Sequence, residues 1–244
     1  MLREALPSVK LAECRHVLSR LRRYKTLQEV EILRRAATLT RKAIDAAFTL
    51  AQVGDTEKVI ANAILNGLIS GGAEDVGFMV LGIGRRSMIT HPIPGPTPLE
   101  AGQVVRVDVG GLFHGGYYSD VARTALGPDP SPEQSETLRK LGRVHKRVIE
   151  QATVGTRFCD LFYFCARLFE EEGLPFHMPH IGHSLGVELH EEPIINPDNG
   201  DVLEENMVLN IEPLCVDERT GSGYHIEDLV WITRDGPVVL TGDR

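Results

Sequence analysis

Apolar residues recur with a helical period in four segments of the chain. In the first segment, residues 26–52, Thr26 and Glu29 form a capping-box pattern, and the apolar residues that follow fall mostly on one face. The other three helices are predicted over residues 55–70, 131–152 and 157–173. The helices thus lie on both sides of a central stretch that has a different pattern.

Runs rich in β-branched residues lie between and after these helices and predict strands. Residues 77–84 and 103–113 are two such runs, and residues 114–127 are predicted to return along the second run through a turn at 114–116. The later strands are predicted over residues 183–190, 207–216, 224–233 and 236–241. This order predicts an α+β protein with helices packed outside an antiparallel sheet. Both halves run from helices to strands, which hints at an internal duplication.

Composition narrows the possible classes of protein. The 244 residues are 42% hydrophobic and 25% charged, as in ordinary globular proteins, and the net charge of −8 argues against nucleic-acid binding. No apolar leader and no run of eighteen apolar residues is present, so we predict no membrane span. Four cysteines without a CxxC pair indicate reduced thiols in a cytoplasmic protein. One domain is predicted over residues 24–244, after a short basic lead-in over residues 1–23.

Several carboxylates stand inside apolar, strand-like runs, where an unpaired charge is costly. They are Asp108, Asp120, Glu212 and Glu227. One such residue is most often an acid that faces solvent from an edge strand, but four make that explanation weaker. The stretch HIGHSLGVELHEEP, residues 180–193, adds His183 as a nitrogen donor.

Four carboxylates and one imidazole form an oxygen-rich ligand set. Such a set suits two divalent ions, Mn²⁺ or Co²⁺ first and Fe²⁺ or Zn²⁺ as alternatives. Two ions that share a water can activate it and polarise a carbonyl. The residues alone therefore suggest a dinuclear hydrolase, provided that the five side chains converge in space, which the sequence does not show.

Five ordered motifs resemble those of the pita-bread metallopeptidases, the family of methionine aminopeptidase, Xaa-Pro aminopeptidase, prolidase and the metal-free creatinase. The motifs are RVDVGG, GGYYSDVART, HIGHSLGVELHEEP, LNIEP and YHIEDLVWIT. The resemblance covers residues 24–244 and implies the pita-bread fold with pseudo-twofold halves. It implies that Asp108, Asp120, His183, Glu212 and Glu227 bind the metal ions, with Asp120 and Glu227 bridging and Glu212 also carrying the proton.

The resemblance also implies roles for other histidines. His190 resembles the histidine that contacts substrate and the developing oxyanion. His91 resembles a substrate-side histidine, although a plain loop residue is the alternative. His180 is either a pocket residue or purely structural.

The chain departs from the family pattern in ways that bear on the substrate. His225 stands where the Xaa-Pro branch commonly has an arginine, and an imidazole holds a substrate carboxylate less firmly than a guanidinium does. The turn between Asp108 and Asp120 is one residue longer than usual, which would reverse a side chain unless the turn or a bulge absorbs it. The N-terminal domain of two-domain members is represented by about 23 residues only.

The leading hypothesis is a metal-dependent hydrolase that cleaves the amide bond before proline in short peptides, as an aminopeptidase or a dipeptidase. A hydrolase of small ureido, amidino or cyclic amide metabolites is the second hypothesis, and His225 favours it. A catalytically inactive binding module is the third, and the complete ligand set argues against it. The partners expected are a short peptide or small amide substrate and a second copy of the chain in a homodimer.

Overall fold

A computed structural model of the protein describes residues 2–242. The helices run α1 Leu2–Ala5, α2 Arg15–Arg23, α3 Leu27–Leu50, α4 Glu57–Ser70, α5 Pro132–Gln151 and α6 Phe158–Glu172, with short 3-10 helices η1 Gly84–Met88 and η2 His114–Gly116. The strands run β1 Asp75–Ile83, β2 Val104–Phe113, β3 Tyr117–Tyr118, β4 Val121–Leu126, β5 Gly182–Ser184, β6 Glu191–Ile194, β7 Val208–Ile211, β8 Leu214–Asp217, β9 Ser222–His225, β10 Asp228–Thr233 and β11 Gly236–Val239. All four predicted helices are confirmed to within two residues at most ends.

The helix ends follow from local side-chain chemistry. Thr26 accepts a hydrogen bond from the Glu29 backbone, and the Glu29 carboxylate accepts one from Thr26 in return, so the predicted capping box is present. Ser131 and Gln134 make the same pair at the start of α5. The helix α6 ends at Gly173 in the left-handed conformation that glycine adopts without strain.

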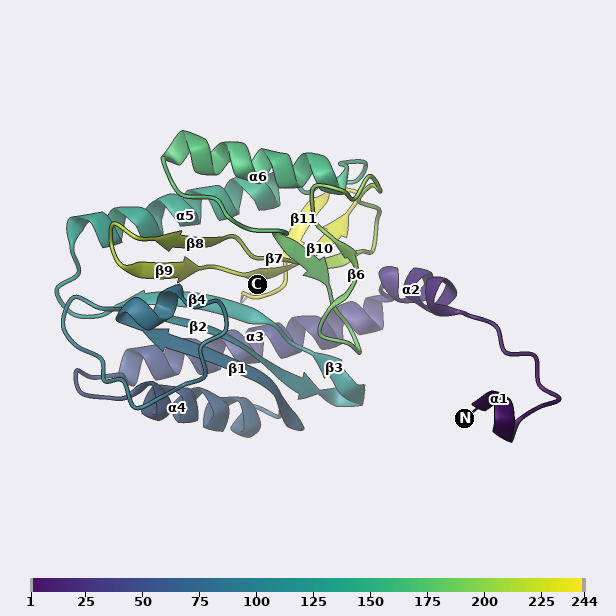
Figure 1. Ribbon diagram of the computed structural model, residues 1–244, viewed down its shortest axis with the longest axis horizontal. Helices are drawn as coiled ribbons and strands as arrows, with labels where there is room; N and C mark the ends of the chain where they lie inside the picture. Colours follow the sequence, from purple (N-terminus) through teal and green to yellow (C-terminus); the bar gives the residue numbers. More distant parts are fainter. Residues whose placement is uncertain (1, 243–244) are drawn as a thin grey trace.

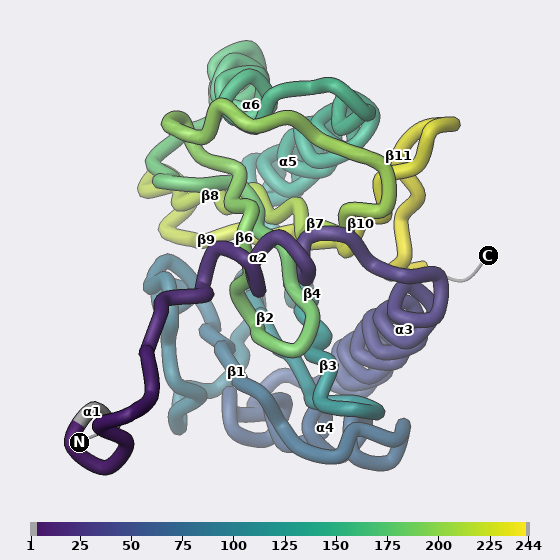
Figure 2. The backbone as a smooth tube through the Cα atoms, turned by 90° about the vertical axis from the view of Figure 1, so that its right-hand side faces the viewer, coloured from purple at the N-terminus to yellow at the C-terminus, as the bar shows by residue number. Residues whose placement is uncertain are grey.

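The strands form antiparallel sheets in two halves of the molecule. In the first half, β2 pairs with β1 on one side and with β3 and β4 on the other. In the second half, a sheet has the order β11-β10-β7-β5-β6, and β8 and β9 form a separate pair. The helices α3 and α4 cover the outside of the first half, and α5 and α6 cover the second (Figure 1). The strands therefore lie between two helical layers, as Figure 2 also shows.

Each half has its own apolar core. Residues of α3, α4, β1 and β2 supply most of one buried cluster, and residues of α5, α6, β7 and β10 supply most of the other. Burial of these faces is the main term that fixes each helix pair on its strands. Where the two halves meet, polar and charged side chains replace the apolar ones, and this junction holds the site described below.

The predicted strand over residues 183–190 is wrong for most of its length. Only Gly182–Ser184 is a strand, and residues 185–190 form a loop that leads into β6. Glu191 holds this loop, because its buried carboxylate accepts hydrogen bonds from the backbone of Val187 and Glu188. Likewise, residues 207–216 and 224–233 each form two strands instead of one.

The turn between β2 and β3 absorbs its extra residue without a bulge. Phe113 pairs with Tyr117 at the turn, and Asp108 pairs with Ala122 further along, so the register between the strands is unbroken. Gly115 and Gly116 both have positive φ and close the turn. As a result the hairpin keeps Asp108 and Asp120 on the same face.

The segment before residue 24 contacts the body of the protein at one place. The helix α2 lies beside β6, and Arg22 and Arg23 form ion pairs with Glu188 and Asp201 at 2.7 and 2.9 Å. The chain before α2 leads away from the body (Figures 1 and 2). Among the described residues, no helix is both long and apolar enough to span a membrane.

Candidate active site

The hairpin of the first half places two carboxylates at the junction between the halves. Asp108 is in β2 and Asp120 lies just before β4. Gly110 allows the two segments of the hairpin to approach closely here, because a Cβ atom at this position would lie 2.0 Å from the Ser119 carbonyl oxygen. Any side chain at position 110 would therefore move Asp120 away from Asp108.

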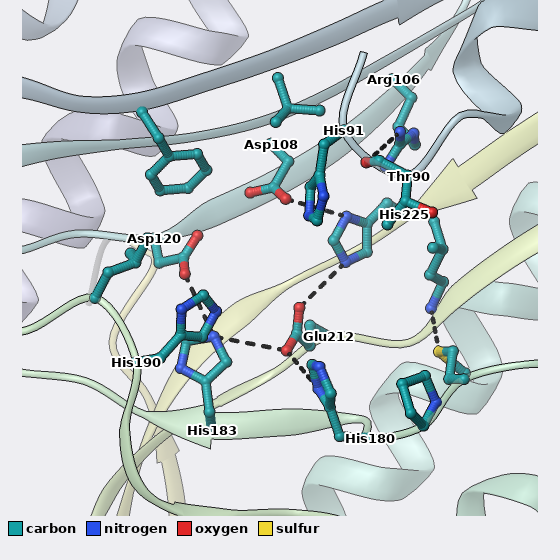
Figure 3. A pocket seen from close by; sticks show the side chains of 16 residues that line it. Thr90, His91, Arg106, Asp108, Asp120, His180, His183, His190, Glu212 and His225 are labelled. Atoms are coloured by element: carbon teal, nitrogen blue, oxygen red, sulfur yellow. Dashed lines mark hydrogen bonds and ion pairs between the residues drawn. The ribbon is translucent and has the colours of Figure 1, made fainter. Parts of the chain in front are cut away.

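The second half contributes His183 and Glu212 through the pairing of β5 with β7. His183 pairs with Asn210, and the Glu212 backbone donates a hydrogen bond to the Ile181 carbonyl at 2.9 Å. Both side chains point into the junction (Figure 3). Pro213 follows Glu212 and lacks an N–H, which helps to explain why β7 ends before Glu212.

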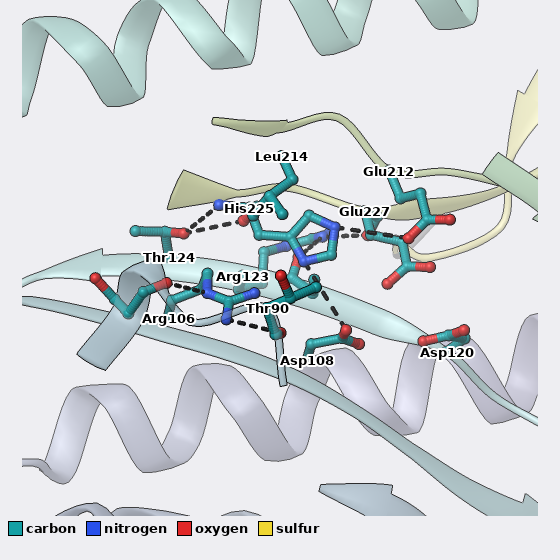
Figure 4. A network of polar contacts seen from close by, with 12 residues as sticks. Thr90, Arg106, Asp108, Asp120, Arg123, Thr124, Glu212, Leu214, His225 and Glu227 are labelled. Atoms are coloured by element: carbon teal, nitrogen blue, oxygen red, sulfur yellow. Dashed lines mark hydrogen bonds and ion pairs between the residues drawn. The ribbon is translucent and has the colours of Figure 1, made fainter. Parts of the chain in front are cut away.

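Glu227 links the two halves directly. Its backbone N–H donates to the Ala122 carbonyl at 3.1 Å, and Arg123 donates to the Glu227 carbonyl and to the Asp228 carboxylate. Figure 4 shows Glu227 between the strands of the two halves. Arg123 thus supports the site from behind and does not line the cavity.

The five residues predicted as metal ligands lie in one cluster. Ligand atoms of Asp120, His183 and Glu227 all lie within 4.8 Å of one another. The His183 Nε2 atom is 3.5 Å from Asp120 Oδ2 and 3.6 Å from Glu212 Oε1. Asp108, Asp120, Glu212 and His183 line a cavity of about 580 Å³ (Figure 3), and Glu227 lies behind them within the same cluster.

The carboxylate oxygens in this cluster lack partners that buried oxygens normally have. Asp108, Asp120, Glu212 and Glu227 each carry at least one buried oxygen without a hydrogen-bond partner, and both Glu227 oxygens lack one. Such atoms are costly unless a cation binds them. The donor set is mostly oxygen with one imidazole, which suits Mn²⁺, Co²⁺, Fe²⁺ or Zn²⁺. The residues present therefore fit a pair of divalent ions.

Burial and mutual repulsion change the proton affinity of the carboxyl groups. Burial, followed by the charge of Glu212, raises the pKa of Asp108 to about 7. Burial and neighbouring carboxylates also raise the pKa of Asp120 and of Glu227 well above the usual range. Without cations the cluster keeps protons that the unfolded chain would release.

These shifts predict how the metal-free protein responds to pH. Above pH 7, carboxyl groups of the unfolded chain have lost their protons, whereas Asp108, with a pKa of about 7, still retains part of one in the folded state. The free energy of unfolding must then fall as pH rises, by up to about 1.4 kcal/mol per pH unit for each proton retained. Urea denaturation of chelator-treated protein at pH 7 and 8.5 measures this slope.

The same measurement on Mn²⁺-loaded protein is the control for the pH effect. Bound cations replace the protons, so we expect a flatter dependence in the loaded protein. Equal slopes in the two forms would show that the carboxyl cluster is not the source.

Three further histidines lie around the cluster, at the positions where substrate roles were predicted. The His190 ring is 4.1 Å from the His183 ring, between centroids, and is exposed to the cavity. His180 Nδ1 lies 3.4 Å from Glu212 Oε1, and this contact raises the pKa of His180. His91 also lines the cavity and is exposed.

Two residues that were not among the predicted site residues, Arg106 and Glu57, hold the His91 segment. Arg106 is 1% exposed, and its guanidinium donates to the backbone carbonyls of Ser87, Ile89 and Thr90. Glu57 is fully buried and accepts hydrogen bonds from Arg86 and from the Gly95 backbone. Arg106 could have been identified from the sequence, because a charged residue inside the apolar run VVRVDV is as unusual as the aspartate two positions later.

His225 lies on the cavity floor and is only 4% exposed. Its Nδ1 atom is 4.0 Å from Asp108 Oδ2, and its Nε2 atom is 3.8 Å from Glu212 Oε2. Burial lowers the pKa of His225 to about 3. The imidazole is therefore neutral, and it sits among the carboxylates, deeper than a residue at the cavity rim.

Comparison with known proteins identifies peptidases as relatives of this chain. Residues 31–234 match the model of metallopeptidase family M24. The chain is 33% identical over 227 residues to an Xaa-Pro dipeptidase of Pyrococcus furiosus, an alignment that covers 92% of this chain and 65% of the relative. The chain thus spans about two thirds of the length of such relatives.

Solved structures show the same fold. A prolidase from Pyrococcus furiosus matches with a TM-score of 0.88 at 31% identity, over 94% of this chain and 68% of that one. An X-Pro aminopeptidase from Thermotoga maritima matches with a TM-score of 0.92 at 27% identity, over 99% and 69%. The predicted α+β architecture and the resemblance to the pita-bread metallopeptidases are both confirmed. The chain belongs to metallopeptidase family M24.

Proposed function

We propose that the protein is a dinuclear metal-dependent hydrolase that cleaves the amide bond before proline in short peptides, as an Xaa-Pro dipeptidase or aminopeptidase. The observation that carries the proposal is the convergence of His183 and four carboxylates with unpartnered oxygens in one buried cluster beside a cavity. The names of the Pyrococcus furiosus and Thermotoga maritima relatives support the choice of bond.

Asp108, Asp120, His183, Glu212 and Glu227 would hold the two ions. When bound, such ions supply a water that is activated at neutral pH and a Lewis acid for the scissile carbonyl. Asp120, from the first half, and Glu227, whose backbone is bound to Ala122 of that half, would be the shared ligands. The clustering of like charges, which is unfavourable in the metal-free protein, then becomes favourable.

Glu212 would move the proton. Its carboxylate lies beside His180 and His183. Burial raises its pKa, but the contact with His180 and the attraction of the other nearby imidazoles outweigh burial, so the net shift of the pKa of Glu212 is downward. A carboxylate that stays ionised can accept the proton of the attacking water and pass it to the leaving nitrogen. The exposed face of the cavity gives a substrate access to this carboxylate.

His190 and His91 both line the cavity that would hold the substrate (Figure 3). Burial lowers the pKa of His190, so its ring is neutral near pH 7 and donates a hydrogen bond from one nitrogen. We propose that His190 donates to the developing oxyanion and that His91 contacts the substrate. His180 would position Glu212.

The cavity wall offers an apolar surface for a proline ring. Phe78, Val80, Met178, Leu189 and Leu214 line the cavity beside the polar cluster. Its volume of about 580 Å³ suits a ligand the size of a short peptide.

A panel of peptides tests the proposal. Mn²⁺- or Co²⁺-loaded protein should release amine from Xaa-Pro dipeptides or Xaa-Pro-Xaa tripeptides and not from matched peptides with alanine in place of proline. The preference for dipeptides or tripeptides assigns the subclass. Cleavage of the alanine peptides at equal rates would contradict the proline preference, and no cleavage by metal-loaded protein would contradict the peptidase assignment.

One observation favours a second candidate, hydrolysis of a small non-peptide C–N bond. Among the described residues that line the cavity, Arg106 is the one guanidinium or ammonium group, and its Nε and Nη2 atoms donate to backbone carbonyls. A dipeptide carboxylate would thus meet one guanidinium that is already partly engaged. Ureido and cyclic amide substrates, added to the same panel, separate the two candidates. The homodimer and the cytoplasmic location stay predictions.

A further inference from the structure

We propose that His225 is a sixth metal ligand, which gives the ion on the Asp108 side its own imidazole. The five ligands implied by the sequence motifs include one histidine, His183, which serves the other ion. The inference rests on the proposed dinuclear centre and adds a donor to it. It concerns the residue at which this chain departs from the arginine common in the Xaa-Pro branch.

The buried ring nitrogens of His225 lack the hydrogen-bond partners that buried polar atoms normally have. The side chain is 5% exposed, and neither ring nitrogen has a hydrogen-bond partner. Leaving two buried polar atoms unsatisfied costs about 1–3 kcal/mol each. Neutral imidazole is the commonest metal ligand in proteins, and its second nitrogen often faces a carboxylate.

The distances to the neighbouring carboxylates suit a shared ion. His225 Nε2 is 3.8 Å from Glu212 Oε2, and ligand atoms of Glu212, His225 and Glu227 all lie within 4.8 Å of one another. Two atoms bound to one ion at about 2.0–2.2 Å each can be up to roughly 4.4 Å apart. One ion can therefore touch Nε2 and Glu212 without a change in the backbone.

This arrangement divides the ligands into two similar sets. Asp120, His183 and Glu227 form one candidate group, and Glu212, His225 and Glu227 form the other, with Glu227 common to both. His183 comes from β5 and His225 from the end of β9, on different sides of Glu212 (Figures 3 and 4). Each ion would then have one imidazole.

The backbone of His225 is held by hydrogen bonds, and its second ring nitrogen faces a carboxylate. Nδ1 faces Asp108 at 4.0 Å, in the direction in which metal-bound histidines commonly donate their other N–H to a carboxylate. Thr124 Oγ1 accepts a hydrogen bond from the His225 N–H at 2.8 Å and donates to its carbonyl at 3.0 Å. The residue is thus held in place before an ion binds (Figure 4).

An added imidazole changes the preference between ions. Imidazole suits Zn²⁺, Fe²⁺ and Ni²⁺, whereas carboxylate and water suit Mn²⁺ and Mg²⁺. An arginine at this position has no lone pair and cannot bind a cation. We therefore expect one of the two sites in this chain to favour Zn²⁺ over Mn²⁺ more strongly than an all-oxygen site would.

The test measures metal binding and not turnover. Zn²⁺ and Mn²⁺ affinities are determined by competition with a chelator for the wild-type chain, for His225→Gln and for His225→Arg. Nitrogen couplings in the pulsed EPR spectrum of the Mn²⁺-loaded protein count the imidazole ligands. His145→Gln is the matched control, because His145 is also a buried histidine, 5% exposed, but it bonds the Ile211 carbonyl outside the cavity.

We expect His225→Gln and His225→Arg to weaken Zn²⁺ binding at one of two sites by about 10-fold or more, to weaken Mn²⁺ binding less, and to remove one set of nitrogen couplings. His145→Gln should keep both sets. Two sites and two sets of couplings in a folded His225→Gln protein would overturn this inference alone. A wild-type chain that binds no divalent ion would overturn the proposed function as well.

Discussion

Glu212→Gln should lower turnover on the best peptide of the panel by on the order of 10³-fold or more. Glutamine keeps the size of the side chain, but it cannot accept and release a proton, and it gives the ions a weaker ligand. The buried unpartnered oxygen of Glu212 shows that the carboxylate faces the site and not solvent. Initial rates at saturating Mn²⁺, with the metal content determined on the same samples, measure the loss.

Glu150→Gln is the matched control, because Glu150 is an exposed glutamate on α5 whose ion pair with Lys146 is long, at 3.8 Å. It should retain full turnover. The far-UV circular dichroism of Glu212→Gln should match that of the wild-type chain. A folded, metal-loaded Glu212→Gln protein with wild-type rates would remove Glu212 from the mechanism.

Lys25→Met should lower the free energy of unfolding by about 3–5 kcal/mol, because it leaves a buried carboxylate without its cation. Lys25 is 4% exposed, and its Nζ atom donates to Glu191 at 3.1 Å, to Ser184 at 2.9 Å and to the Arg22 carbonyl at 2.7 Å. Glu191 also holds the loop that carries His190. The substitution should therefore reduce turnover in addition to stability.

Urea denaturation of Lys25→Met and of the double variant Lys25→Met, Glu191→Met separates the cost of an unpaired buried charge from the loss of the other contacts of Lys25. The double variant should regain part of the loss, because it buries no unpaired charge. Lys146→Met, which removes a lysine from an exposed pair, should change stability by less than about 0.5 kcal/mol. A similar small change in Lys25→Met would show that the buried pair contributes little.

The helices could be predicted from the sequence because their signals are local. The capping box of Thr26 and Glu29 and the left-handed glycine at 173 lie within a few residues of the helix ends that they define. The strand predicted over 183–190 failed because its true conformation depends on Glu191 and Lys25, which lie 166 residues apart in the chain. No pattern within the stretch itself indicates that contact.

Most members of the carboxylate cluster could be predicted from the sequence, but their arrangement in space could not. Acidic residues inside apolar runs identified Asp108, Asp120, Glu212 and Glu227 before any coordinates. The position of His225 could not be read in this way, because its burial depends on how β9 lies against β2 and β4. From the sequence, His225 is interpreted as a substrate-binding residue that replaces an arginine. In the structure it lies in the cavity wall among the carboxylates.

The division of the cluster between two halves also has a consequence for folding kinetics. Asp108 and Asp120 belong to the first half, and His183 and Glu212 belong to the second, with Glu227 bound to the backbone of the first through Ala122. Either half alone offers too few donors to hold two cations tightly. High-affinity binding of two ions would therefore wait until the halves dock, and the ions would then slow the separation of docked halves without changing the rate at which each half forms its helices and strands.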